Sequence, residues 1–195
     1  MALVLKTAPA AEPILPAEAK LHLRVDHDDE DTYISALIKT ARHDAETITR
    51  RALITQTWEL VMDDWPENDW FEIPLPPLQS VTSITYTDSD GAMHTLSAAD
   101  YVVDTDSEPG RVRLVDGASW PTVELRPLSA IRVTFVAGYG DAGAAVPEPI
   151  RQAMYLLIGH YYENREAVIN STGANVQLLP LGVTTLLQTY RMFCF

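Results

Sequence analysis

The stretch that most constrains the fold covers residues 146–168, where apolar side chains recur at the spacing of an α-helix. Pro147 and Pro149 suit the first turn of such a helix, where a missing N–H costs nothing. Tyr155 and Tyr162 carry apolar surface onto a second face, so we expect burial inside the domain or against a neighbouring subunit. Five apolar side chains lie at i, i+4, i+7, i+8 and i+11, the helical period: Ile150, Met154, Leu157, Ile158 and Tyr161.

Length and cysteine content narrow the class of protein. A chain of 195 residues is long enough for one sizeable domain or two modules sharing a core. Cys194 is the single cysteine, which excludes an internal disulfide and a zinc site made of cysteines. The longest apolar runs are far shorter than the roughly 20 residues of a membrane span, and no signal-peptide pattern is present. We therefore expect a protein made and folded in a reducing cytoplasm.

The net charge of −13 is unevenly distributed along the chain. Residues 54–137 contain 14 acidic residues against four arginines and no lysine, a balance of −10. Such a surface repels nucleic acid unless a basic patch intervenes, and the sequence contains no such patch. Tight DNA binding is therefore not expected, although the protein can form a passive wall beside DNA.

Three further segments are predicted to be helical. Residues 16–23 form a short helix that begins at Pro16, and residues 28–50 form a long one with acidic residues at its N-terminal end. The third segment covers residues 179–190, and residues 1–12 are expected to be an extended arm that lies on a neighbouring subunit. The apolar stripe of the long helix consists of Tyr33, Ile34, Leu37, Ile38, Ala41, Ala45 and Ile48.

From residue 55 the apolar period changes to two, which indicates β-strands. In the first strand, Trp58, Leu60 and Met62 alternate with Thr57, Glu59, Val61 and Asp63, so we expect it to be half-buried. The second is expected to be short or at a sheet edge because of Pro74. Turns at residues 88–91 and 107–110 each join two strands in a hairpin. The later strands cover residues 71–75, 81–87, 93–96, 101–104, 111–115 and 130–136.

These elements predict an α+β fold. Short strands at this spacing favour a small antiparallel sandwich or barrel. We expect a single domain over residues 1–195, in which a helical frame of residues 13–53 and 146–195 carries an inserted β module at residues 54–137.

Two motifs that suggest ligand binding fail closer inspection. Gly138, Gly140 and Gly143 form a literal G-x-G-x-x-G, but in a dinucleotide site the helix begins inside the motif, whereas here two prolines delay it. The acidic run 26–31 invites a calcium site, yet an EF-hand loop needs Gly at its sixth position, where this chain has Asp31. We expect a glycine loop at a sheet-to-helix junction and a solvated helix start.

No catalytic, cofactor-binding or metal-binding constellation is evident in the sequence. The five histidines are scattered without the spacing of a zinc face, and there is no nucleophile elbow or phosphate-binding loop. Asp63 and Asp64 are the kind of carboxylate pair that hydrolysis requires, but such pairs arise freely in so acidic a chain. The four tryptophans lie in or near the β part, where core or interface packing is the expected use.

The C-terminal residues 190–195 are rich in large apolar side chains, which are a solubility liability at a free end. Two interpretations stay open. The segment folds back into the core of its own subunit, or its aromatic side chains insert into a pocket of a partner.

Several stretches stand out together, in order along nearly the whole chain. They are Pro16-Ala17-Glu18-Ala19-Lys20 with 22–26, residues 51–58, 75–81 with 84–86, Phe135-Val136-Ala137-Gly138-Tyr139-Gly140, Val146-Pro147, and Tyr162-Glu163-Asn164-Arg165-Glu166. Together they resemble the head–tail connector (adaptor) proteins of long-tailed phages, prophages and gene transfer agents. None of these stretches is catalytic, so the resemblance rests on pattern and order.

The resemblance implies a structural virion protein rather than an enzyme. Such adaptors form a ring, expected to be dodecameric, beneath the portal protein, extend the DNA channel and present a platform for the stopper or tail-completion protein. In related adaptors the C-terminal segment reaches into the portal, which by position implies a portal contact here. Tyr155 and Tyr162 are our candidates for contact between neighbouring subunits. The implied portal-contact residues are Tyr190, Arg191, Met192, Phe193 and Phe195.

Two other functions remain as alternatives. The protein is another virion component, such as a stopper or a β-rich decoration protein, or, more remotely, a hydrolase that uses two carboxylates in the β module. The location of the protein in intact particles distinguishes the first alternative, and a cleft with two converging acids is required by the second.

Overall fold

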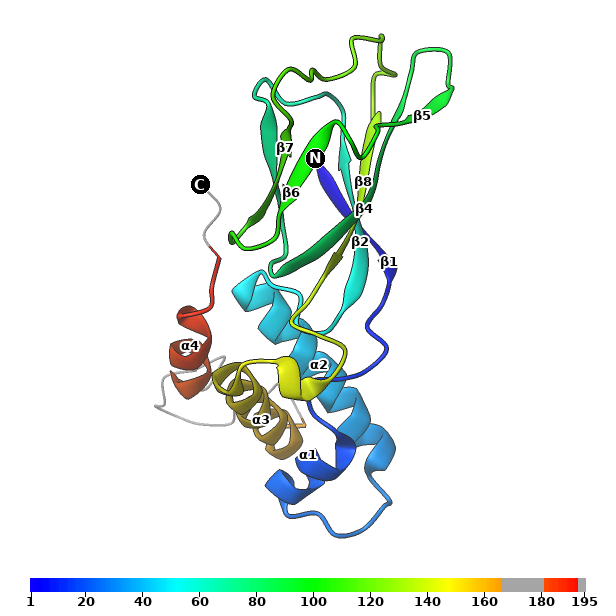
Figure 1. The fold of residues 1–195 in the computed structure, drawn as a ribbon. Coiled ribbons are helices and arrows are strands. Elements are labelled where there is room, and N and C mark those ends of the chain that lie inside the picture. The colour runs from blue at the N-terminus through cyan, green and yellow to red at the C-terminus, as the bar shows by residue number, and fades with distance from the viewer. Residues whose placement is uncertain (166–180, 193–195) are drawn as a thin grey trace, which may run out of the picture. The chain divides into compact units, whose positions relative to one another are not determined.

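The computed structural model describes residues 1–165 and 181–192, which form two compact units (Figure 1). One unit comprises Ala11–Ile54 and Gly140–Phe195, and the other comprises Met1–Ala10 and Thr55–Tyr139. The first is helical and the second is built from strands. The described residues contain four α-helices and two antiparallel sheets, which confirms the predicted α+β class.

The first two helices of the helical unit follow the predicted pattern closely. Helix α1 covers Pro16–Leu23, and the carboxylate of Glu18 accepts a hydrogen bond from the N–H of Leu15 at 2.8 Å, which satisfies a free donor at the helix start. Helix α2 covers Asp31–Thr49. Five residues of the predicted stripe of α2 are buried, whereas Tyr33 and Ile48 are half-buried. The buried face consists of Ile34, Leu37, Ile38, Ala41, Ala45 and Thr49.

Helix α3 covers Glu148–Glu163 and is shorter than the predicted 146–168. Asn164 ends it, because both its N–H and its side-chain amide donate to the carbonyl oxygen of His160, at 3.0 and 2.8 Å. Residues 166–168 lie outside the described part of the chain. Helix α4 covers Leu181–Gln188, with Val183 and Leu187 buried. Four of the five predicted apolar positions of α3 are buried and Tyr161 is half-buried. The buried face consists of Ile150, Ala153, Met154, Leu157 and Ile158.

The larger sheet has five strands in the order β1-β2-β8-β4-β5, and all its neighbours are antiparallel. In chain order the strands are β1 (Ala2–Thr7), β2 (Gln56–Met62), β4 (Leu78–Thr87), β5 (Met93–Thr95) and β8 (Ile131–Ala137). The predicted hairpin at residues 88–91 joins β4 to β5. Its turn is fixed by Asp88, whose Oδ1 accepts hydrogen bonds from the N–H groups of Asp90 and Ala92.

The smaller sheet has three strands in the order β3-β7-β6, which are β3 (Trp70–Ile73), β7 (Gly110–Leu114) and β6 (Tyr101–Asp104). Strand β3 is short and lies at the edge, as predicted from the following proline. The two sheets approach closely at Gly110, where an added Cβ would lie 2.5 Å from the Leu78 side chain. The core of this unit includes Leu60, Phe71, Ile73, Ile84, Val112, Ile131, Val133 and Phe135.

Two expectations for this unit need correction. Residues 2–7, expected to be an extended arm, form β1 and pair with β2 of their own unit from Ala2↔Val61 to Thr7↔Thr57. The expected contact of this segment with a neighbouring subunit stays a prediction. Strand β2 is also more buried than an alternating strand should be. Glu59, expected on the wet face, is 6% exposed because it lies between two cations, Arg132 and Lys6, on the neighbouring strands.

Candidate functional site

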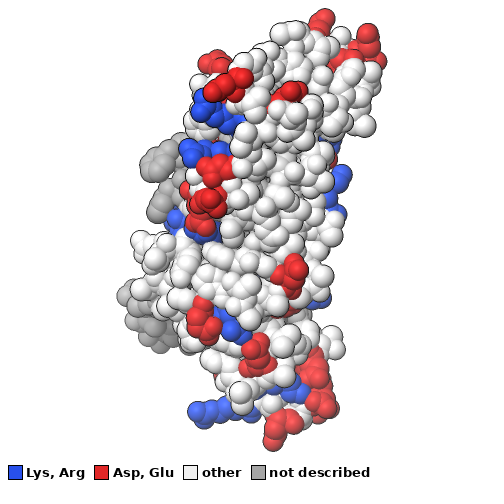
Figure 2. Space-filling model, viewed as in Figure 1, with Lys and Arg blue, Asp and Glu red and all other residues white. Residues whose placement is uncertain are grey.

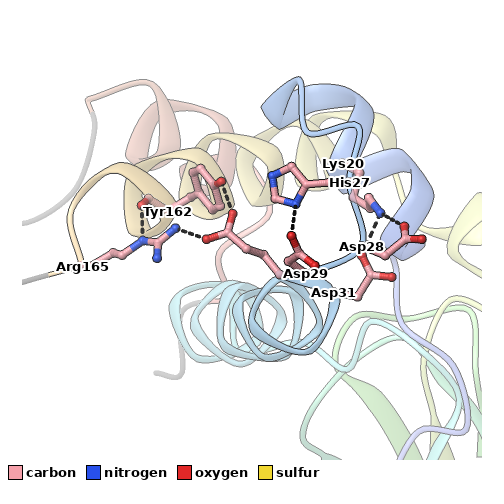
Figure 3. Close-up of polar contacts among 8 residues, drawn as sticks. Lys20, His27, Asp28, Asp29, Asp31, Tyr162 and Arg165 are labelled. Carbon is pink, nitrogen blue, oxygen red and sulfur yellow. Dashed lines mark hydrogen bonds and ion pairs between the residues drawn. The ribbon is translucent and has the colours of Figure 1, made fainter.

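A polar and aromatic cluster joins the start of α2 to the end of α3 (Figure 3). Glu30 accepts a hydrogen bond from the hydroxyl of Tyr162 and another from Arg165 Nη2 at 2.5 Å. The Arg165 guanidinium lies 4.8 Å from the ring centre of Tyr33 and 5.0 Å from that of Tyr162, so it makes a cation–π contact with each of these two rings. We call Glu30, Tyr33, Tyr162 and Arg165 the α2–α3 clasp.

The residues of the clasp shift one another's pKa values. The hydrogen bond from Tyr162, followed by that from Arg165, holds the pKa of Glu30 below its ordinary value. The same carboxylate raises the pKa of the Tyr162 phenol. The preceding residue on α3, Tyr161, donates to Asp44 at 2.7 Å, and burial together with that carboxylate raises the pKa of Tyr161. At neutral pH the clasp therefore holds the ionised carboxylate of Glu30, the ionised guanidinium of Arg165 and the neutral phenol of Tyr162.

The acidic run at the start of α2 forms ion pairs with a lysine of the same chain. Lys20 on α1 contacts Asp28 at 2.6 Å and Asp31 at 2.8 Å, while His27 lies 3.8 Å from Asp29 (Figure 3). The two carboxylates raise the pKa of Lys20, and Lys20 lowers that of Asp28. The acidic run thus ties α1 to the start of α2.

At its other end, α2 holds the C-terminal segment. The helix ends at Arg50, which has a left-handed backbone, and the next side chain, Arg51, is 7% exposed. Arg51 Nε donates to the carbonyl oxygen of Tyr190 at 2.7 Å, and Nη2 lies 3.5 Å from Sδ of Met192. The N–H of Met192 donates to the carbonyl oxygen of Thr49 at 2.9 Å, which satisfies a free acceptor at the helix end.

The predicted portal-contact residues are thus only partly described. Tyr190 and Met192 are half-buried against their own helical unit and Arg191 is exposed, whereas Phe193 and Phe195 lie outside the described residues. For residues 190–192, the fold-back interpretation describes the position in the free chain. Whether they contact a partner stays a prediction.

The predicted subunit-contact residues also have partners within the chain. Tyr162 belongs to the clasp. Tyr155 is half-buried, its ring centre 5.2 Å from that of His22 on α1, and burial raises its pKa. Both tyrosines keep part of their surface exposed, so the sequence prediction for them stays open.

The glycines of the loop at residues 138–143 allow a backbone conformation and a close contact that other residues would not allow. Gly138 has φ of 133° and donates its N–H to Pro77 at 2.9 Å. An added Cβ at Gly143 would lie 2.2 Å from the carbonyl oxygen of Pro13. Helix α3 begins at Glu148, beyond the motif, so its N-terminal amides are not part of the glycine loop. This placement confirms the geometric reason for rejecting a nucleotide site.

The tryptophans of the strand unit differ in their packing and in their exposure to solvent. Trp65 and Trp120 stack with ring centres 4.8 Å apart, whereas Trp70 is 38% exposed. Trp70 lines a hollow of about 720 Å³ over the smaller sheet. The other residues that line it include Val102, Asp104, Arg111, Arg113 and Asp116.

The carboxylates of the strand unit have structural partners. Asp104 accepts from Ser107 Oγ at 2.6 Å and from Arg111 at 2.7 Å, and these bonds hold its pKa below the ordinary value. Asp63 accepts from the N–H of Ser129 at 2.7 Å and so fixes the turn before β8. The hydrolase alternative gains no support from these two placements, because Asp104 and Asp63 both bind groups of their own chain.

Charge is mixed on the face of the molecule drawn in Figure 2. The face in Figure 2 shows acidic side chains interspersed with basic ones and no broad basic area. Within residues 1–165 and 181–192, no three His, Cys, Asp or Glu side chains are grouped to hold a metal ion. Over the same residues, no helix has the length and apolarity needed to cross a membrane.

Sequence reasoning missed Arg51 and the pairing of Glu30 with Tyr162. Arg51 stands directly after a long helix and before the apolar run Ala52-Leu53-Ile54, and a cation in that position was the available signal. No local pattern signals the partner of Glu30, because Tyr162 lies 132 residues further along the chain.

Comparison with known families and structures gives a consistent result. Residues 17–105 match the family described as phage gp6-like head–tail connector proteins. A search of curated proteins found no match.

Solved structures match over the whole chain. A chain in the neck of an empty gene transfer agent particle, computed with C6 symmetry, aligns with a TM-score of 0.82 and 26% identity, covering 100% of this chain and 97% of that one. A chain in the virion of a native gene transfer agent particle aligns with a TM-score of 0.81 at the same identity and coverages. A chain in the neck of a native particle, computed with C12 symmetry, aligns with a TM-score of 0.78, also at 26% identity and with the same coverages.

Proposed function

We propose that this chain, a structural head–tail connector by its family match and its fold, forms a ring at the neck of a tailed particle. The observation that carries the proposal is the full-length match to chains in the necks of gene transfer agent particles. The C6 and C12 symmetries of those necks support an oligomeric ring. A dodecamer under the portal is the assembly we expect.

In this assembly the protein extends the DNA channel and offers a platform for a stopper or tail-completion protein. The net charge of −13 suits such a channel wall, because an acidic surface lets DNA pass without sticking to it. The role is structural rather than enzymatic, and the matched proteins belong to particle necks. We propose assembly in the bacterial cytoplasm and a final location at the head–tail junction of the virion.

The portal contact is assigned to residues 190–195. Support comes from the described residues 190–192, since Arg191 is exposed and Arg51 and Thr49 bind the backbone of Tyr190 and Met192 at the end of α2. If this segment enters a portal pocket, the bonds that Arg51 and Thr49 make to it are exchanged for contacts with the portal. Tyr155 and Tyr162, each with surface left exposed, are assigned to contacts between neighbouring subunits.

Electron microscopy of the purified full-length protein mixed with the portal assembly of its particle tests the proposal. We expect a ring of added density on one end of each portal. Failure to bind portals at any ratio would overturn the proposal. A protein that binds only after another connector has occupied the portal is a stopper, and density over the capsid surface indicates a decoration protein.

A further inference from the structure

Strand β1 is an exposed edge strand. It stands at one end of the five-stranded sheet, and its outer edge faces no other described strand. All six of its residues are exposed, a property that among the described strands it shares only with the three-residue β5. Leu3, Val4 and Leu5 are 39, 43 and 44% exposed. An edge strand with free backbone groups and uncovered aliphatic side chains readily pairs with another chain, so proteins usually protect it.

The register places the apolar side chains on both faces of this edge. Leu3 lies opposite Leu60 on β2, so it shares the face of Leu60, which is 1% exposed. Leu5, two residues on, is on that same core-side face. Val4 lies opposite Glu59 on the other face. The apolar core layer therefore continues out to an edge that the described residues leave uncovered.

The charge of the edge is opposite to that of the unit around it. Residues 1–10 contain no acid, and Lys6 is the one lysine of a unit in which residues 54–137 have a charge balance of −10. The Lys6 side chain is 49% exposed and lies 3.6 Å from Glu59, which already has Arg132 as a closer partner. Lys6 thus has capacity for a further carboxylate, and the partner that suits this edge is acidic.

We infer that β1 is a docking strand for a neighbouring copy of this chain in the ring. The inference rests on the proposed ring. A chain of charge −13 presents acidic surface, so copies repel one another unless a contact brings a cation to that surface. An acid-free strand with one lysine and three exposed aliphatic residues supplies that contact. The resulting interface is head-to-tail, because β1 of one copy contacts a different surface of the next copy. Interfaces of this kind can close into rings.

Ring formation by paired variants tests the inference. Leu3→Thr with Leu5→Thr keeps β-propensity and removes apolar contact, and Val102→Thr with Leu128→Thr is the matched control, since Val102 and Leu128 are 59 and 72% exposed in the same unit. We expect the first pair to reduce the fraction of portals that carry a complete ring by at least about tenfold, and the control pair to leave it unchanged. Circular dichroism of the monomers checks that each variant folds.

The outcomes separate the inference from the proposed function. Wild-type protein that forms no ring on portals contradicts the proposed function. If wild-type protein forms rings and the Leu3→Thr, Leu5→Thr variant forms them equally well, the docking strand is wrong.

Zero-length crosslinking gives an independent readout. Rings assembled from a mixture of ¹⁴N- and ¹⁵N-labelled protein are treated with a carbodiimide, which joins Lys6 to any carboxylate it touches. The crosslink from Lys6 to Glu59 within one chain is the internal control. Mixed-isotope peptides that join Lys6 to an acid of another copy support the inference. Crosslinks from Lys6 that are confined to single chains contradict it.

Discussion

Arg51 Nε donates a hydrogen bond to the carbonyl oxygen of Tyr190, 2.7 Å away, across 139 residues of sequence. This contact sets the end of α2 against the segment that leaves α4. It holds residues 190–192 against their own helical unit. From the sequence alone, two positions were possible for this segment: the core of its own subunit or a pocket of a partner.

Replacing Arg51 by Met should release this segment. The substitution keeps an apolar stem but removes a charged donor from a buried site, so we expect a loss of about 1.5–3 kcal/mol in the free energy of unfolding. The amide of Met192, which is bonded to Thr49, should exchange with deuterium faster. Urea unfolding and hydrogen exchange measure the two effects. Arg50→Met is the control, because Arg50 is exposed. Equal exchange of Met192 in both variants would contradict the role of Arg51.

The clasp predicts a pH dependence of stability. The folded pKa of Glu30 is lowered, so its contribution is complete above the unfolded value of about 4.3 and is lost as the pH falls below that value through the folded pKa. Glu30→Gln should remove this contribution, so the difference in stability from wild type should be larger at pH 7 than at pH 3. Unfolding by urea at both pH values measures it. Glu163→Gln, at an exposed position on α3, should show no such dependence. A difference for Glu30→Gln that does not change with pH would show that the clasp is not ionic.

Two glycines on either side of the start of α3 should respond in opposite ways to alanine. At Gly143 the new Cβ would lie 2.2 Å from the carbonyl oxygen of Pro13, so Gly143→Ala should destabilise the protein by about 1–3 kcal/mol. At Gly159, inside α3, the closest atom is His22 Nε2 at 3.5 Å, so Gly159→Ala should stabilise by up to about 1 kcal/mol. Thermal unfolding of the two variants measures both signs. A neutral Gly143→Ala would mean that the loop is not held by packing.

The sequence predicts this structure wherever a pattern is local. The stripe from Ile34 to Ala45 carries its own period, and the turn at residues 88–91 carries its own chemistry, so both were predicted. Strand β1 was missed because its six residues gain their conformation from pairing with β2, more than 50 residues away.

The candidate site depends even more on distant contacts. Tyr162 was singled out from the pattern of one helix, but its bond to Glu30 exists only because α3 packs against α2. The contacts of Arg51 could not be predicted from the sequence for the same reason, since its partners Tyr190 and Met192 lie near the end of the described chain. A local pattern shows which face is apolar, whereas a polar contact needs the partner element in place.

The assignment of Tyr155 to a contact between subunits can be tested against its contact with His22. Tyr155→Ala should lower the fraction of portals with complete rings by about tenfold, because aromatic side chains dominate such contacts. Leu21→Ala, at an 82% exposed position on α1, should not lower it. Electron microscopy counts the rings, and urea unfolding of the monomer measures how much of the effect is internal. If rings form normally while the monomer is destabilised, Tyr155 serves its own subunit alone.

The C-terminal segment gives the sharpest test of the portal contact. Deleting residues 192–195 should leave the helical unit folded, since the buried side chains of α4 precede them, and should abolish attachment to portals. Replacing Phe193 and Phe195 by Ser should have the same effect on attachment, while replacement of both by Leu should preserve it, because an apolar anchor remains. Cosedimentation with portals measures attachment.

The Arg51→Met variant completes this test, because it separates release of the segment from loss of the segment. If the portal takes up residues 190–195 after they leave the end of α2, a chain whose segment is already free should attach at least as tightly as wild type. The deletion variant should fail under the same conditions. Normal attachment of the deletion variant would remove the segment from the mechanism. Failure of Arg51→Met, with its helical unit intact by circular dichroism, would mean that the portal recognises the segment in its position against α2, held there by Arg51.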